Sequence, residues 1–215
     1  MMNFSLKRAQ GATILLLAVT LSACQTTGVK NESGVQTTYQ DSTKPGPATG
    51  IGIEGQDIIA MADAMMRDMM LSPQLANAAV PPRVIIDAKH FTNESAQRIN
   101  KNLIADRLRV GLLRAARGRM QFVGREYADV VAKERELKRS GTVDVATTGR
   151  TQAQAGSDYR LVGRIASLDS RDTSTGMQQR FTQITFEMVD LESGILIWTN
   201  IYDFTKAAAD SVTYR

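Results

Sequence analysis

The sequence predicts an α/β fold, in which helices pack on a mixed sheet that ends in a C-terminal antiparallel meander. Apolar residues recur at helical spacing in residues 56–70. Within residues 178–190, Ile184, Phe186 and Met188 alternate with Thr185 and Glu187, as in a half-buried strand. The patterns follow the order helix, strand, helix, strand, helix and then three strands, which is typical of helices packed on one sheet.

Residues 1–23 have the features of a signal peptide that is removed from the mature chain. Lys7 and Arg8 precede an apolar stretch of about eleven residues, which is too short to span a bilayer. Residues 21–24 (Leu-Ser-Ala-Cys) resemble the bacterial lipobox, and this resemblance implies that Cys24 becomes the first residue and carries the lipid. Gln25, where Asp would indicate retention in the inner membrane, suggests the outer membrane. The alternative is an ordinary signal peptide followed by an incidental cysteine.

Residues 25–50 are rich in small polar residues and have no apolar periodicity, which predicts a flexible tether. We therefore divide the chain into a removed signal peptide (1–23), a lipidated cysteine with its tether (24–55) and a folded periplasmic domain (56–215). The tether of about thirty residues spans ~30 Å as a random coil and ~100 Å when fully extended. Removing Lys7 and Arg8 takes the formal net charge from +4 to +2, which offers no electrostatic basis for binding nucleic acid.

The first half of the domain is predicted to be mainly helical. The helix at 56–70 carries a methionine-rich face, which either packs on the sheet, as we prefer, or forms an adaptable groove. A buried strand is expected at 83–88, and Thr92 to Ser95 offer N-caps for a helix that runs to about Arg117. Its apolar stripe is Ile104, Leu108, Leu112 and Ala115, with Gly118 as the C-cap glycine.

A strand at 120–123 and a helix at 127–139 should follow, with Val130, Val131 and Leu137 pointing inward. Residues 140–150 form a polar loop, with the option of a short helical turn up to Ala155. The remaining strands are expected at 159–168, 178–190 and 195–204, with a polar loop at 169–177 and a tight turn before the last strand.

Residues that could carry chemistry are few. One cysteine excludes an intramolecular disulfide, and one histidine with no available thiol leaves only carboxylates as metal ligands, so we expect no metal and no cofactor. His90 follows a strand and is either solvated, as we prefer, or the base of a hydrolase. Residues 50–55 match G-x-G-x-x-G, but no strand precedes them, which favours a flexible hinge over a nucleotide site.

Two further features have a structural and a functional interpretation. Trp198 is expected in the core rather than on a sugar-binding surface. A basic stretch is expected to be the solvated side of a helix, with an acidic partner as the alternative. Its members are Arg98, Lys101, Arg107, Arg109, Arg114, Arg117, Arg119 and Arg125.

Several segments in this order resemble the LpoB family: the lipobox, the polar tether, the methionine-bearing helix, and the stretches RVIIDAKHFTNES, GSDYRLVGRI and SGILIWTN. The similarity covers most of residues 56–204. It implies a fold similar to the N-terminal domain of TolB and to the periplasmic part of the curli secretion lipoprotein CsgG. It also implies an outer-membrane lipoprotein that binds and activates a bifunctional class A penicillin-binding protein.

The resemblance carries over no catalytic, cofactor-binding or partner-contact residues, so we expect a non-enzymatic regulator, monomeric in solution. The tether is short and has few prolines, so the two proteins can meet only if the synthase projects toward the outer membrane or the periplasm is thin. The alternatives are a structural or secretion lipoprotein of the curli-pore kind and a periplasmic hydrolase that uses His90.

Overall fold

The structure is a computed structural model of the chain, and it describes residues 39, 41, 44, 50–147 and 149–209. The first half contains helix α1 (Gly55–Leu71), the short helix α2 (Pro73–Ala76), strand β1 (Arg83–Asn93) and helix α3 (Lys101–Ala116). Strand β2 (Gln121–Phe122), the 3-10 turn η1 (Arg125–Tyr127) and helix α4 (Ala128–Ser140) follow. Three long strands complete it: β3 (Tyr159–Arg171), β4 (Gln178–Asp190) and β5 (Leu196–Ala208).

The five strands form one mixed sheet in the order β2-β1-β3-β4-β5. Strand β1 is parallel to both β2 and β3, whereas β4 is antiparallel to β3 and β5. The expected α/β class and the C-terminal meander are therefore confirmed. The meander follows from the alternation in β4, where Ile184, Phe186 and Met188 are buried and the residues between them are partly exposed.

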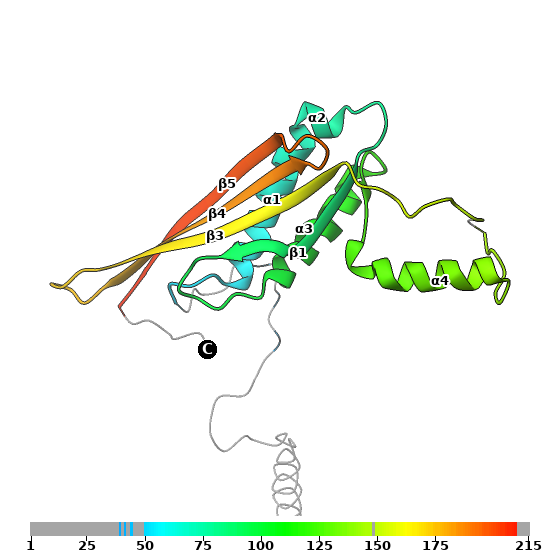
Figure 1. Cartoon of the computed structure of the whole chain (residues 1–215). Coiled ribbons are helices and arrows are strands. Elements are labelled where there is room, and N and C mark those ends of the chain that lie inside the picture. Colours follow the sequence, from blue (N-terminus) through cyan, green and yellow to red (C-terminus); the bar gives the residue numbers. More distant parts are fainter. Residues whose placement is uncertain (1–38, 40, 42–43, 45–49, 148, 210–215) are drawn as a thin grey trace, which may run out of the picture. The chain divides into compact units, whose positions relative to one another are not determined.

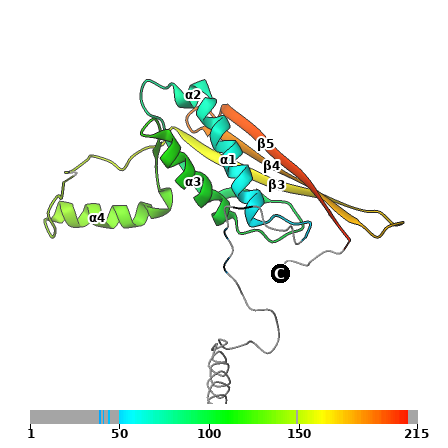
Figure 2. The same cartoon turned by 180° about the vertical axis from the view of Figure 1, so that it is seen from behind.

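Helices α1 and α3 lie on the same side of the sheet, as the two opposite views of Figures 1 and 2 show. The predicted methionine face of α1 packs into the core, because Met61, Met65 and Met69 are fully buried. Gly111 of α3 lets the two helices approach closely, since a Cβ atom there would lie 2.1 Å from Sδ of Met66. No described helix covers the opposite face of the sheet.

Trp198 lies in the core, as predicted. Its side chain is 8% exposed, and its indole N–H donates to Oδ2 of Asp68 on α1 at 2.7 Å. This bond satisfies the polar atom of a buried aromatic residue and joins β5 to α1.

The expected start of the second helix is wrong. Helix α3 begins at Lys101 and is capped by Asn100, whose side chain accepts from the N–H of Asn102 at 3.1 Å. The residues expected to cap it belong to β1 and the turn after it, because Phe91, Thr92 and Asn93 pair with β3. Strand pairing overrides the local capping signal. The predicted stripe holds at Ile104, Leu108 and Leu112, but Ala116 is buried in place of Ala115, which is exposed.

Helix α4 forms where it was predicted, but its expected inward face is wrong. None of its thirteen residues, all of them described, is buried, and the side chains of Val130 and Val131 are 69% and 42% exposed. The helix does not pack on the sheet, so its regularly spaced apolar residues are not buried in a core. The helical turn expected before Ala155 is absent from the described residues 149–158.

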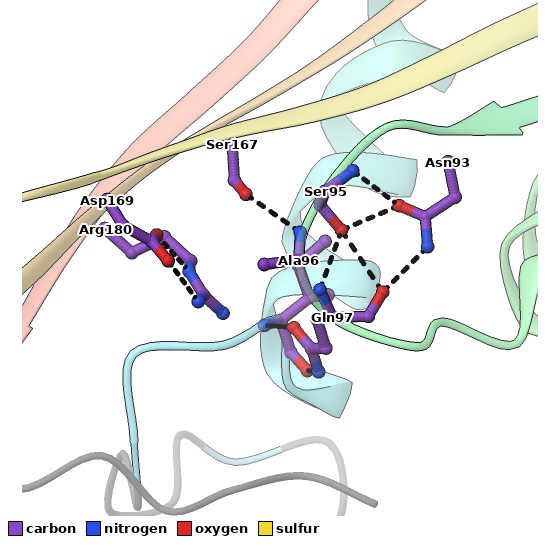
Figure 3. A network of polar contacts seen from close by, with 8 residues as sticks. Asn93, Ser95, Ala96, Gln97, Ser167, Asp169 and Arg180 are labelled. Carbon is purple, nitrogen blue, oxygen red and sulfur yellow. Dashed lines mark hydrogen bonds and ion pairs between the residues drawn. The ribbon is translucent and has the colours of Figure 1, made fainter.

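Residues 50–55 are not the flexible hinge that was expected. Ile51 and Ile53 are buried, and the Gln97 amide holds the main chain of Ile53 by accepting from its N–H (2.6 Å) and donating to its C=O (3.1 Å). Figure 3 shows Gln97 in a polar network, where its main chain bonds to Asn93 at the end of β1 and to Ser95 in the turn that follows. The chain therefore enters α1 through a fixed segment.

Lys206 on β5 also contacts the segment 50–55 and the first turn of α1. Its ammonium group contacts Asp57 at 2.6 Å, Glu54 at 3.5 Å and the C=O of Gly52 at 3.0 Å. All three charged side chains are at most 20% exposed. Two sets of contacts, from Gln97 and from Lys206, therefore fix the segment that leads into α1.

Strand β3 runs further than expected, to Arg171, where it pairs with Gln178 at the expected start of β4. The tip between the two strands has six residues, 172–177. A bidentate ion pair between Arg180 and Asp169 (2.6 and 2.7 Å) joins the two strands near this tip, and Figure 3 shows both bonds. Among the described residues, no helix is long and apolar enough to cross a membrane.

Candidate functional site

The uncovered face of the sheet presents polar and apolar side chains in cross-strand rows. Val162 lies opposite Glu187, and Arg164 lies opposite Thr185. Thr185 in turn lies opposite Ile201 of β5, which is 52% exposed. In Figure 1 this face is turned toward the viewer, in front of α1 and α3. A mixed surface of this kind is typical of a protein contact rather than of a substrate pocket.

Strand β1 is interrupted beside this face. Its register with β3 passes from Ile86↔Leu161 directly to Phe91↔Gly163, so residues 87–90 bulge out of the ladder. Phe91 and Phe186 close the break from the covered side, with ring centroids 5.5 Å apart. Only glycine fits beneath them at position 163, because a Cβ would lie 2.9 Å from the ring of Phe186. The core therefore fixes where the bulge begins and ends.

His90 is exposed at the end of this bulge. Nη1 of Arg160 on β3 donates to its Nε2. Nε of Arg160 is buried and has no partner among the described residues. His90 lines a hollow of about 550 Å³ with Asp87 and Arg160, and another of about 340 Å³ with Glu94 and Glu187.

Ion pairs hold the wall of the larger hollow in place. Arg109 on α3 pairs with Asp106 at 2.6 Å and with Glu126 of η1. It also reaches the C=O of Ile86, immediately before the bulge, at 3.5 Å. The arrangement can recognise charged and hydrogen-bonding groups. Among the described residues, no cluster of His, Cys, Asp and Glu could hold a metal ion.

Turns at the two ends of the meander hold ionised carboxylates. The Ser174 hydroxyl, with N–H groups of Ser174 and Thr175, lowers the pKa of Asp172 to about 2. Main-chain N–H groups of Ser193 and Glu192 lower the pKa of Asp190 in the turn before β5. The guanidinium of Arg180 lowers the pKa of Asp169. Asp172 and Asp190 stabilise turns, and Asp169 joins β3 to β4.

The structure distributes the predicted site residues over several places. Cys24 lies outside the described residues. The basic stretch is not one face, because Arg109 is paired with carboxylates and Lys101 donates to the C=O of Phe91, whereas Arg114 and Arg117 are exposed. Arg160 and Gln97 were missed, since the distant contacts that define them leave no local pattern. The polar interruption at 87–90 of an otherwise apolar strand was the available signal for the bulge.

Comparison with known proteins finds a matching family model and several similar solved structures. A model of the family described as peptidoglycan-synthase activator LpoB matches residues 57–204. Among solved structures, the LpoB C-terminal domain from Escherichia coli is similar at 13% identity and a TM-score of 0.40, over 69% of this chain and 98% of that one. The corresponding Salmonella enterica domain gives 15% and 0.34, over 68% and 94%. A search of curated proteins gave no match.

Proposed function

We propose that this chain, which belongs to the LpoB family of peptidoglycan-synthase activators, is an outer-membrane lipoprotein that binds a bifunctional class A penicillin-binding protein and stimulates it. The observation that carries the proposal is the extent of the family match, which runs from the first turn of α1 into β5 and includes β1, β2, β3 and β4 in full. The chain acts as a regulator, and the synthase supplies the chemistry.

The architecture supports regulation by contact. A whole face of the sheet is left without a described helix, and the bulge beside it presents fixed polar and charged groups, His90 and Arg160 among them. Fixed polar groups beside exposed apolar residues such as Ile201 suit recognition of a folded partner. We expect the domain to be monomeric before it binds.

Lipid on Cys24 is the second part of the proposal. The lipobox resemblance of residues 21–24 supports it, and Gln25 favours the outer membrane. The tether then keeps the domain within ~30 Å of the membrane on average. Replacing Cys24 with Ser should abolish incorporation of labelled palmitate. Label retained on the C24S chain would contradict the lipid anchor.

Binding is tested with the full-length chain in detergent and the purified synthase from the same cell. We expect a one-to-one complex on size-exclusion chromatography with light scattering. A sample of the same chain in its unfolded state is the control for non-specific binding to the detergent-solubilised synthase. The absence of any complex, at concentrations well above those in the envelope, would reject the partner.

A further inference from the structure

A groove at the opposite edge of the sheet from β5 carries charge that the fold does not neutralise. It runs between the edge strand β2, helix α4 and the returning segment 151–155, and has a volume of about 620 Å³. Phe122, Val123 and Val131 supply its apolar lining. Arg83, Arg125 and Arg135 supply its charged lining, and no acidic residue lines it. We call it the arginine groove.

The three guanidiniums are held by neutral groups. Arg125 donates to the C=O of Ala155 and the hydroxyl of Ser157, both at 3.3 Å. Arg135 donates to Thr151, Gln152 and Ala153 at 2.7–3.2 Å. The side chain of Arg83 donates to Gln121 at 3.4 Å.

None of the three forms an ion pair with a described carboxylate. Asp158 is close to Arg83, but its carboxylate accepts from the main-chain N–H at 2.7 Å. Elsewhere the fold does pair such groups, since Arg109 meets two carboxylates and Arg180 meets one in bidentate geometry. Three preorganised positive charges over an apolar lining complement a ligand that is both acidic and apolar.

The edge strand β2 also has main-chain groups that can bond to an extended ligand. Gln121 and Val123 donate their N–H groups toward β1, to Pro82 and Val84, both at 2.9 Å. Alternate residues of a strand direct these groups to opposite sides, so the N–H and C=O of Phe122 face the free edge of the sheet. An extended segment can therefore bond there while its side chains reach the guanidiniums.

We infer that the arginine groove binds an extended acidic segment of the partner synthase, with carboxylates on Arg83 and Arg125 and an apolar side chain against Phe122 and Val131. This inference rests on the proposed function and names one contact of it. Arg125 also lines the hollow beside His90, so the groove and the site at the bulge are neighbours.

The test uses the full-length chain in detergent with the purified synthase. Arg83→Glu is the main variant, because Arg83 is exposed and only its main chain is strongly bonded. Arg125→Gln is the second, and Arg114→Glu, a charge reversal at an exposed position of α3, is the matched control. Circular dichroism and thermal melting establish that each variant is folded.

We expect R83E to weaken synthase binding about tenfold and R125Q by less, with the R114E control within about twofold of wild type. A photo-crosslinking residue at position 131 should label an acidic stretch of the synthase. If the wild-type chain binds the synthase and both groove variants bind it with the same affinity, the inference about the groove is wrong and the proposed function stands. The inference is also wrong if Arg83→Glu abolishes binding of cell-wall peptides to the chain but leaves the affinity for the synthase unchanged. Failure of the wild-type chain to bind any synthase would reject the proposed function itself.

Discussion

Helices α3 and α4 occupy equivalent places in the chain and have opposite relations to the sheet. Each follows one strand of the parallel part and precedes the next, α3 between β1 and β2 and α4 between β2 and β3. Helix α3 buries five residues against the sheet, whereas α4 buries none of its thirteen. The connection that contains α3 contributes to the core, whereas the connection that contains α4 lies at the surface.

The composition of α4 explains how it forms without a core. Lys138 pairs with Glu134 at 3.7 Å one turn earlier, and basic residues lie in the last turn. Gly141 ends the helix in the left-handed conformation, at a φ of 79°. Arg135 and Arg139 fasten one side to the segment that returns to β3. Local interactions of this kind support a helix that holds one wall of the arginine groove.

The largest expected difference between the two helices is in global stability. Leu108→Ala removes a fully buried side chain of α3 and should lower the free energy of unfolding by about 3 kcal/mol. Val130→Ala on α4 should change it by less than about 0.5 kcal/mol. Urea unfolding of both variants measures the contrast. A loss above about 1 kcal/mol for Val130→Ala would mean that α4 packs against something in solution.

A smaller effect is expected where the core closes the break in β1. Gly163→Ala places a methyl group 2.9 Å from the ring of Phe186 and should cost about 1–3 kcal/mol. Gly156→Ala is a matched control, because nothing lies within 4 Å of a Cβ at that position. Equal melting temperatures for the two variants would contradict the tight packing on the side that α1 and α3 cover.

A third effect should be confined to α4 and its return. Arg135→Ala removes hydrogen bonds to Thr151, Gln152 and Ala153, so hydrogen exchange in residues 128–155 should accelerate about tenfold. The global free energy of unfolding should change by less than about 0.5 kcal/mol, because the core is untouched. Lys133→Ala, an exposed position on the same helix, is the control. Equally slow exchange in both variants would show that Arg135 does not hold the helix.

The smallest effect concerns pH and the tip of the β3–β4 hairpin. The pKa of Asp172 is about 2 in the folded chain and 3.8 ordinarily. Its contribution to stability is thus fully present above pH 3.8 and is lost as the pH falls through about 2. Chemical-shift titration of the carboxyl should give a midpoint near 2, whereas Asp190 should titrate below 3.8. A midpoint at 3.8 or above for Asp172 would contradict the hydrogen bonds from Ser174 and Thr175.

The sequence predicts the elements that depend on neighbouring residues better than those that depend on contacts between distant residues. The bounds of β4 were predicted because Ile184, Phe186 and Met188 alternate with polar residues and a turn signal follows Asp190. The start of α3 was not, since Asn93 and Ser95 serve a turn whose position depends on pairing with Ile165. Apolar spacing in α4 predicted a helix, but it could not show that no sheet face lies beneath it.

The candidate site was harder to predict than the fold. Arg83, Arg125 and Arg135 come from β1, η1 and α4, so only the assembled sheet and the returning segment bring them together. His90 was singled out as a lone histidine, but its partner Arg160 lies seventy residues away. Such sites depend on long-range contacts, and a single sequence carries no local pattern for them.

The central claim is that the domain stimulates a synthase by contact, and the rate of lipid II polymerisation by the purified class A synthase tests it most directly. The account predicts that the full-length chain raises this rate, that R83E raises it less at the same concentration, and that R114E matches the wild type. An unchanged rate with saturating wild-type chain would contradict the account.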